Sequence, residues 1–159
     1  TANSARQMTP MRSPGFTPHL QEALARARVE AHNLRHDHIG PEHLALGVLL
    51  TPPTSGTGIL SEADAQAAAA EIVRRAGPGN TDEPLGGPDL PYSPRAKRAM
   101  EGALREARSL AHDRLGCGHL LLGVLRDEED FPKDVFHELG LDLDAVRASV
   151  RQESDSHEA

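Results

Sequence analysis

The stretch HDHIGPEHLALGVLL, residues 36–50, returns at residues 112–126 as HDRLGCGHLLLGVLR. The match extends upstream, so that residues 16–50 align with residues 92–126 without a gap, and 15 of these 35 pairs are identical. A constant offset of 76 residues over such a length indicates an internal duplication. The sequence therefore predicts two copies of one structural unit.

Each copy begins with the features of a helix start, because Thr17 and Ser93 each precede a proline. A hydroxyl side chain is a favoured N-cap, and proline is tolerated at the first helical position because its missing N–H has no intrahelical partner. Apolar residues then recur at steps of three and four, which is typical of one buried stripe on a helix. We expect these first helices to end near His36 and His112.

A second helix is expected near residues 41–50 and 117–126, where apolar residues are dense enough to predict the most buried element of each copy. Gly47 and Gly123 lie inside it, although glycine costs about 1 kcal/mol relative to alanine in a helix. Their presence in both copies predicts a close approach between two helices at these positions.

The remaining segments predict a short and then a longer helix over residues 58–76, with counterparts after Val135. The chain is therefore expected to be all-α, with about eight helices in two pseudo-symmetric halves that form one domain. The expected organisation is a flexible segment at 1–15, a first repeat at 16–76, a Pro/Gly-rich linker at 77–91, a second repeat at 92–152 and a polar tail at 153–159.

Composition narrows the classes of function. The net charge is −7, with 24 acidic and 17 basic side chains, and aromatic residues make up only 3% of the chain, so binding of nucleic acid is not expected. No apolar run approaches the roughly 20 residues of a membrane span, and no signal peptide is recognisable. Cys117 is the only cysteine, which excludes an intrachain disulfide and favours a reducing cytoplasm.

The two copies together resemble the N-terminal (Clp repeat) domain of ClpC- and ClpA-type AAA+ unfoldases, most closely that of ClpC from GC-rich bacteria. The resemblance is carried by FTP at 16–18 and IGPEHL at 39–44, and by YSPRAK at 92–97 and LGCGHLLLGVL at 115–125. It covers roughly residues 16–152. It implies two four-helix repeats and a non-enzymatic role in capturing substrate or adaptor proteins for an unfoldase and its partner protease.

The sequence contains no G-x-x-x-x-G-K-[ST] phosphate-binding loop, so this chain is not expected to hydrolyse ATP. Two interpretations remain open. The chain is either a domain of a larger unfoldase, in keeping with its start at Thr1 rather than Met, or a ClpC-like paralogue without a motor. A paralogue of the second kind would act as a decoy that draws ligands away from the working unfoldase.

The resemblance also implies a site for phosphorylated arginine in each repeat. The glutamate of the family's G-T-E-H motif, which contacts the guanidinium, corresponds to Glu42, and Thr17 is the expected phosphate contact beside it. In the second repeat Ser93 replaces the threonine and Gly118 replaces the glutamate, which puts that site in doubt. The alternative for Glu42 is a first-turn carboxylate that interacts with the helix dipole.

A surface for cyclic peptide antibiotics is implied where the first helices of the two repeats meet. An apolar peptide ring needs an exposed aromatic anchor with polar neighbours. The alternative for the aromatic residue is packing on its own helix start. The expected residues are Leu24, Arg28, Tyr92, Lys97, Met100 and Glu101.

The remaining reactive side chains favour structural roles. Four histidines cluster over residues 32–43, but neither a cysteine pair nor H-E-x-x-H spacing accompanies them, so no metal or other cofactor is expected. His43 and His119 are predicted to make structural hydrogen bonds. The acidic run 127–130 is expected to be a solvated face rather than a catalytic pair. Two other functions stay open: a hydrolase built on His and carboxylate groups, and a regulatory domain fused to a DNA-binding segment upstream of Thr1.

Overall fold

The computed structural model describes residues 15–51, 61–79, 90–126, 131–140 and 143–158. Within these ranges the chain forms seven helices and two very short strands. Their bounds are β1 (Gly15–Phe16), α2 (Pro18–Asn33), α3 (Pro41–Leu50), α4 (Glu62–Ala76), α5 (Pro94–Ser109), β2 (Arg114–Leu115), α6 (Cys117–Leu125), α7 (Phe131–Glu138) and α8 (Leu143–Glu158).

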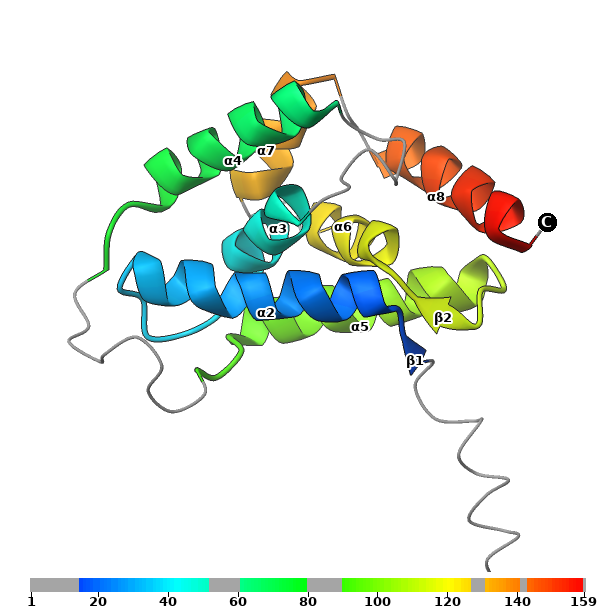
Figure 1. Ribbon diagram of the computed structural model, residues 1–159, viewed down its shortest axis with the longest axis horizontal. Helices are drawn as coiled ribbons and strands as arrows, with labels where there is room; N and C mark the ends of the chain where they lie inside the picture. The colour runs from blue at the N-terminus through cyan, green and yellow to red at the C-terminus, as the bar shows by residue number, and fades with distance from the viewer. Residues whose placement is uncertain (1–14, 52–60, 80–89, 127–130, 141–142, 159) are drawn as a thin grey trace, which may run out of the picture.

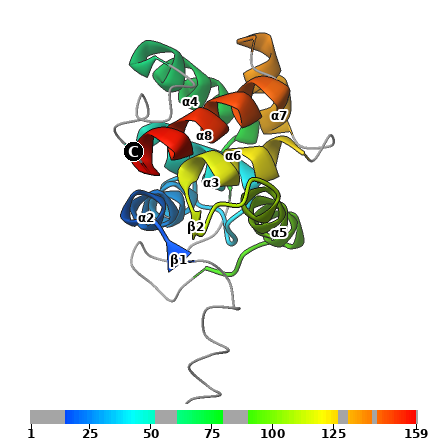
Figure 2. The same cartoon turned by 90° about the vertical axis from the view of Figure 1, so that its right-hand side faces the viewer.

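The helices stack in three tiers. In Figure 1, α2 and α5 lie along the lower side, α3 and α6 fill the middle, and α4, α7 and α8 lie above them. Figure 2 looks along the lower helices and shows α2 and α5 on either side, beneath α3 and α6. The helix contacts follow the repeat: α2 packs on α3 and α5 packs on α6, while α3 and α6 pack on each other. The all-α prediction is confirmed.

The central pair is the most buried part of the fold, as expected from its dense apolar residues. All residues of α6 are buried, and in α3 the residues from Pro41 to Leu49 are buried except Glu42. Because α3 and α6 are covered above and below, they cannot present polar faces, which explains why their sequences lack a 3.6-residue polar period.

Gly47 and Gly123 mark the points where these central helices cross the lower ones. A Cβ on Gly47 would overlap the carbonyl oxygen of Ala23, and a Cβ on Gly123 would overlap that of Ala99. The predicted close approach is therefore confirmed in both repeats. The absence of a side chain lets two backbones touch, which offsets the helix propensity lost at glycine.

The first helix of each repeat begins where the sequence predicts but ends earlier than predicted. Thr17 Oγ1 accepts the N–H of Leu20, and Ser93 Oγ accepts the N–H of Ala96, each at 3.1 Å, so both N-caps are confirmed. In contrast, α2 and α5 end three residues before the predicted histidines. Arg35 and Ala111 adopt left-handed backbone angles, with φ of 61° and 59°, and turn the chain out of the helix.

Two parallel backbone pairings join the repeats, and the sequence pattern predicts neither. Phe16 of β1 pairs with Leu115 of β2, and Ile39 forms an isolated bridge with Tyr92. The two pairings are equivalent under the 76-residue offset, so the pseudo-twofold relation extends to the backbone hydrogen bonds. The residue just before the first helix of each repeat (Phe16 or Tyr92) therefore pairs with the residue just before the central helix of the other repeat (Leu115 or Ile39).

Two expectations fall at the edges of the described structure. The short helix predicted near residues 58–60 lies outside the described residues. Helix α8 continues beyond residue 152, although a polar tail is predicted from the sequence to begin at residue 153.

We predict that Gly47→Ala destabilises the protein by about 2 kcal/mol or more, because the new methyl group would force α2 and α3 apart at a backbone contact. Urea unfolding followed by circular dichroism measures this loss. Gly102→Ala is the matched control. Gly102 is also buried inside a helix, but its added Cβ would meet only atoms at 3.4 Å or more. The control is expected to be neutral or stabilising by up to about 1 kcal/mol, and equal losses in both variants would contradict the argument.

Candidate functional site

The backbone pairings create two equivalent regions, here called poles, in which residues of both repeats come together. The Glu42 pole contains the starts of α3 and α5, and the second pole contains the starts of α6 and α2. At one pole the N–H of Ser93 donates to the carbonyl oxygen of Ile39 at 2.9 Å, which places the start of α5 beside the start of α3. At the other pole the N–H of Thr17 donates to the carbonyl oxygen of Leu115 at 2.9 Å, which places the start of α2 beside the start of α6. Two helix N-termini meet at each pole.

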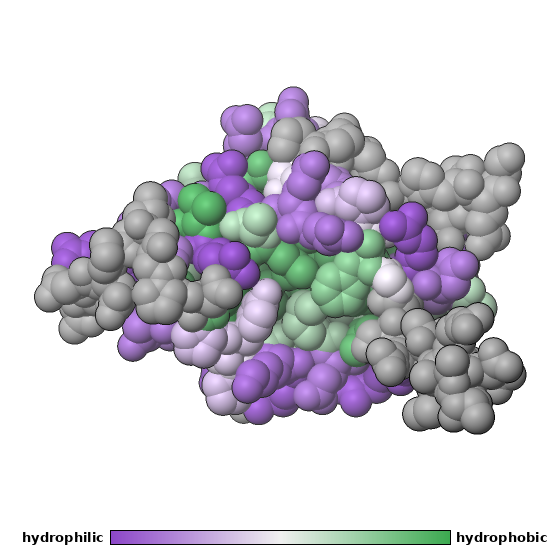
Figure 3. Space-filling view, turned by 60° about the horizontal axis from the view of Figure 1, so that its bottom comes forward, coloured by the Kyte–Doolittle hydropathy of each residue, from purple (hydrophilic) through white to green (hydrophobic). Residues whose placement is uncertain are grey.

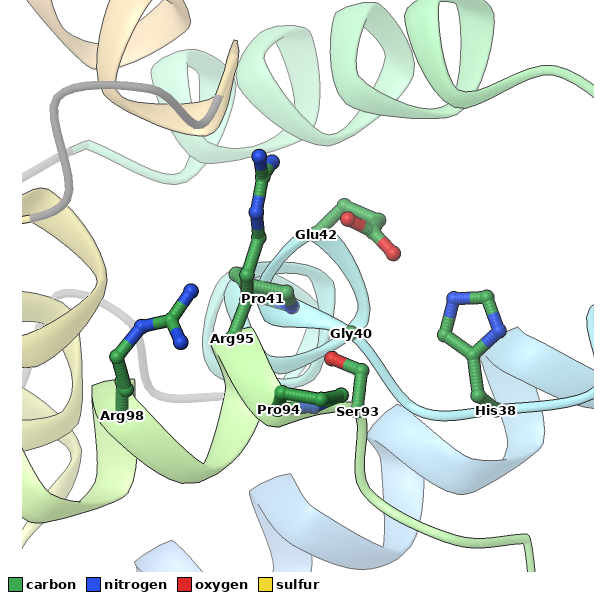
Figure 4. A pocket seen from close by; sticks show the side chains of 8 residues that line it. All are labelled: His38, Gly40, Pro41, Glu42, Ser93, Pro94, Arg95 and Arg98. Atoms are coloured by element: carbon green, nitrogen blue, oxygen red, sulfur yellow. The ribbon is translucent and has the colours of Figure 1, made fainter.

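A cavity of about 420 Å³ opens at the first of these poles. Its wall combines the N-terminal turn of α3 with that of α5, as Figure 4 shows. The cavity has a carboxylate and an imidazole on one side and two guanidinium groups on the other, with a hydroxyl group between them. The lining residues are His38, Gly40, Pro41, Glu42, Ser93, Pro94, Arg95 and Arg98.

Glu42 supplies the negative charge of this cavity. Its side chain folds back over Gly40, where a Cβ would overlap the carboxylate, and it keeps 17% of its surface exposed. One carboxylate oxygen lies 3.3 Å from Nδ1 of His43. This contact is not an ion pair, because Nδ1 of His43 already accepts the backbone N–H of Gly40 at 2.8 Å. His43 therefore does not neutralise the Glu42 carboxylate, which lines the cavity.

The neutral state of His43 follows from a chain of hydrogen bonds. Because its Nδ1 accepts from Gly40, the neutral ring carries its proton on Nε2, which lies 2.7 Å from Nδ1 of His36. His36 in turn donates from Nε2 to the carbonyl oxygen of Gly77 at 2.9 Å. Burial, followed by the neighbouring His36 and His38, lowers the pKa of His43 from 6.5 to about 3.

The second repeat contains the same hydrogen-bond arrangement. Gly116 N–H donates to Nδ1 of His119 at 2.9 Å, and Nε2 of His119 lies 2.8 Å from Nδ1 of His112. Burial, and next the neighbouring His112, lowers the pKa of His119 to about 4. The predicted structural role of His43 and His119 is confirmed. Both imidazoles hold the loop that leads into the central helix of their repeat.

Arg95 and Arg98 supply the positive side of the cavity, and neither is among the site residues predicted from the sequence. Both are exposed, and both belong to the first turns of α5. Their spacing of three residues, directly after the Ser93 N-cap, places them on one helix face, which is the feature that would have indicated them. Ser93 Oγ accepts a backbone N–H, so its own O–H remains able to donate into the cavity.

The expected partners of Glu42 require one correction. Thr17 does not lie beside Glu42, because it belongs to the opposite pole, where a Cβ on Gly116 would lie 3.8 Å from its methyl group. Ser93 takes that place instead and lines the cavity together with Glu42. The pairing within one repeat is wrong because the backbone bridges exchange the first segments of the two repeats.

The residues expected to bind a cyclic peptide lie on or next to the lower helices. Leu24 on α2 and Met100 on α5 occupy equivalent positions, and both are half-buried against the core, as is Tyr92. Arg28, Lys97 and Glu101 are exposed. Figure 3 turns the lower side of the molecule toward the viewer and shows an apolar band bordered by hydrophilic side chains.

Metal binding, the single cysteine, the acidic run and membrane insertion were the remaining possibilities raised by the sequence. Within the part of the chain that the structure describes, no group of three or more His, Cys, Asp or Glu side chains is arranged to hold a metal ion. Cys117 is buried at the start of α6, and the acidic run 127–130 lies outside the described residues. Among the described helices, none is long and apolar enough to cross a membrane.

Known proteins are similar to this chain in sequence and in fold. A family model described as the Clp repeat (R) N-terminal domain matches residues 15–139 and, separately, residues 91–158. The ATP-dependent Clp protease ATP-binding subunit ClpC of Staphylococcus saprophyticus is 36% identical over 137 residues, which cover 85% of this chain and 16% of that protein. The chloroplastic chaperone protein ClpC2 of Oryza sativa is 34% identical over 141 residues, which cover 85% and 15%.

Among solved structures, the N-terminal domain of the chaperone ClpD from Arabidopsis thaliana superimposes with a TM-score of 0.63 at 23% identity. The match covers 85% of this chain and 91% of that one, and it shows a shared fold. The chain spans about one sixth of the length of the curated relatives it matches.

We predict that the protein loses stability as the pH falls from about 6.5 toward about 4. The pKa of His43 and of His119 is lowered in the folded state, so the unfolded chain takes up these protons first and acid favours unfolding. Each histidine contributes a slope of at most about 1.4 kcal/mol per pH unit. Urea unfolding at a series of pH values measures the slope. His119→Asn is expected to reduce it, and His137→Gln, at an exposed position, is expected to leave it unchanged. A flat profile in the wild-type protein would contradict the neutral-histidine arrangement.

Proposed function

The chain belongs to the Clp repeat N-terminal domain family, and on that premise we propose that it is a recognition domain, one that binds substrate or adaptor proteins for a Clp unfoldase. The relatives' names place them in an ATP-dependent protease and in chaperones, which supports a binding role beside a separate motor. The cavity between α3 and α5 supports the same role, because it presents charged groups without a nucleophile paired to a base.

The ligand we propose for this cavity is a phosphorylated arginine side chain on a protein. Such a group carries a planar guanidinium beside a phosphate, so its recognition needs a carboxylate next to groups that stabilise negative charge. The single observation that carries the proposal is that one cavity is lined by the Glu42 carboxylate on one side and by the guanidinium groups of Arg95 and Arg98 on the other. A ligand that carries a cationic and an anionic group side by side satisfies both sides.

Each lining group has a separate task in this proposal. The Glu42 carboxylate accepts paired hydrogen bonds from the guanidinium of the ligand. Arg95, Arg98 and the O–H of Ser93 bind the phosphate, aided by the positive end of the α5 dipole. Gly40 has no side chain, which leaves room for the Glu42 carboxylate to lie over the loop.

We propose the apolar band on the lower side as a second binding surface, for cyclic peptide antibiotics. Tyr92 is half-buried, so part of its ring packs on the core while the rest is available as an anchor. Leu24 and Met100 extend the apolar contact from the two lower helices, and Arg28, Lys97 and Glu101 supply the polar rim.

The same binding supports a decoy role in a protein without an ATPase module. There the domain would withhold marked proteins or peptides from an active unfoldase instead of delivering them. An ATPase module in the full-length protein would exclude the decoy and leave the recognition role intact.

We predict that Glu42→Gln weakens binding of phosphoarginine by roughly 10-fold to 100-fold, because hydrogen bonds to charged groups contribute about 1.5–3 kcal/mol. Isothermal titration calorimetry with free phosphoarginine measures the change, and unmodified arginine is expected to bind much more weakly. Glu62→Gln is the matched control, since Glu62 is also an acidic residue in the first turn of a helix but lies outside the cavity. Equal affinity of the wild-type protein and Glu42→Gln would refute the assignment.

We predict that Tyr92→Ala weakens binding of a ClpC-directed cyclic peptide by about 2 kcal/mol, or roughly 30-fold, as is usual for an aromatic anchor. Tyr92 pairs with Ile39 through its backbone, so the variant is expected to keep the fold. Calorimetry with the peptide measures the effect. Val29→Ala, which removes an exposed apolar side chain from α2 outside the proposed surface, serves as the control. Unchanged affinity in Tyr92→Ala would mean that the surface is misplaced.

A further inference from the structure

The pseudo-twofold relation generates a second pole, and its chemistry differs from that of the Glu42 pole. Under the 76-residue offset, Glu42 corresponds to Gly118, so the second pole has no carboxylate at the position that Glu42 occupies in the first. Thr17 supplies a hydroxyl group there in place of Ser93. The second pole therefore keeps the hydroxyl group but lacks the counterpart of the Glu42 carboxylate.

The two arginines that line the first cavity from α5 are not repeated on α2 at the second pole. Arg95 corresponds to His19 and Arg98 corresponds to Glu22. Nε2 of His19 lies 3.2 Å from the carbonyl oxygen of Thr51, so this ring is engaged within the fold. Glu22 is exposed and places a negative charge where the other pole has a positive one. Arg114, which corresponds to His38, is an exposed cation at this pole, and its Nη2 lies 3.5 Å from the carbonyl oxygen of Phe16. Glu22 opposes a phosphate group that approaches the start of α2, where Arg98 attracts one at the start of α5.

Helix α8 fills the place that a side chain at position 118 would need. A Cβ on Gly118 would lie only 2.5 Å from Cγ2 of Val150, and Val150 itself is 4% exposed. Gly118 is buried beneath it. A glutamate like Glu42 cannot be accommodated there while α8 keeps this position.

An ion pair holds α8 in that position. Arg147 of α8 donates to both carboxylate oxygens of Glu106 on α5, from Nη2 at 2.7 Å and from Nε at 3.1 Å. Arg126 lies 3.5 Å from the same carboxylate. The hydrogen bond from Arg147 lowers the pKa of Glu106, so the pair stays ionised at neutral pH. The equivalent residue in the first repeat, Glu30, pairs only locally with Arg26 among the described residues.

From these three differences we infer that the domain is univalent: it binds one phosphoarginine-type group per chain, at the Glu42 pole, and α8 closes the equivalent pole. The inference rests on the proposed phosphoarginine function and adds its stoichiometry. A univalent domain holds a single mark on a partner, so a second mark on the same partner adds no chelate effect within one chain.

The stoichiometry of phosphoarginine binding to the whole chain tests this inference by calorimetry. The wild-type protein is expected to bind one equivalent, and Glu42→Gln is expected to weaken that equivalent by the same 10-fold to 100-fold and to leave no equivalent at the wild-type affinity. Two equivalents in the wild-type protein, or one unweakened equivalent left in Glu42→Gln, would overturn the inference and leave the proposed function standing. No binding to the wild-type protein at all would instead overturn the proposed function, and the inference with it.

A ligand-free measurement tests the closure by α8. Gly118→Ala alone is expected to lower the thermal midpoint by several degrees. In the double variant, Val150→Ala makes room for the new methyl group, so the combined loss is expected to be smaller than the sum of the two single losses. Strictly additive effects in this double-mutant cycle would show that the two residues do not oppose each other. They would overturn the closure by α8.

The opened pole offers a gain-of-function test. The variant that combines Gly118→Glu, Val150→Ala and Glu22→Arg is expected to bind two equivalents of phosphoarginine. Circular dichroism confirms that it is folded before titration. A folded variant that still binds one equivalent would contradict the explanation given for the closed pole.

Discussion

The backbone hydrogen bonds between the repeats are the constraint on which the rest of the structure depends. The pairings of Phe16 with Leu115 and of Ile39 with Tyr92 fix where each first helix begins relative to the central helix of the other repeat. They bring Ser93 to Glu42 and Thr17 to Gly116. Since both poles arise from these bridges, any ligand that binds at a pole contacts both halves of the chain.

The histidine pairs give these poles their electrostatic character. An imidazole that accepts the N–H of Gly40 organises the helix start without bringing a positive charge. A lysine or arginine in that place would neutralise Glu42, and an aliphatic residue would leave the N–H unsatisfied at a cost of about 1–3 kcal/mol. Burial keeps His43 neutral, and a neutral His43 leaves the charge of Glu42 available to a ligand. Stability and binding are therefore linked through one side chain.

The sequence predicts those features that are local or that recur in both copies. The N-caps at Thr17 and Ser93, the glycine crossings and the histidine hydrogen bonds all follow from residue type at a repeated position. An alignment of one copy with the other shows which residues are equivalent but not which copy a residue contacts, so the cross-repeat pairing of Ser93 with Glu42 is not predictable in this way. Arg95 and Arg98 lie outside the repeated pattern, and Arg35 and Ala111 adopt the left-handed conformation without being glycine.

The exchange of first segments has a consequence for how such a protein arises. A lone repeat would expose the edge at Ile39 and would have no place for its own leading residues, so it is incomplete as a monomer. Two identical copies would satisfy each other in an isologous homodimer whose poles are alike. Covalent fusion removes the requirement for that symmetry. One pole can then keep its acidic and basic lining residues while α8 packs over the other pole. A dimer of identical subunits cannot diverge in this way, because one sequence specifies both of its poles.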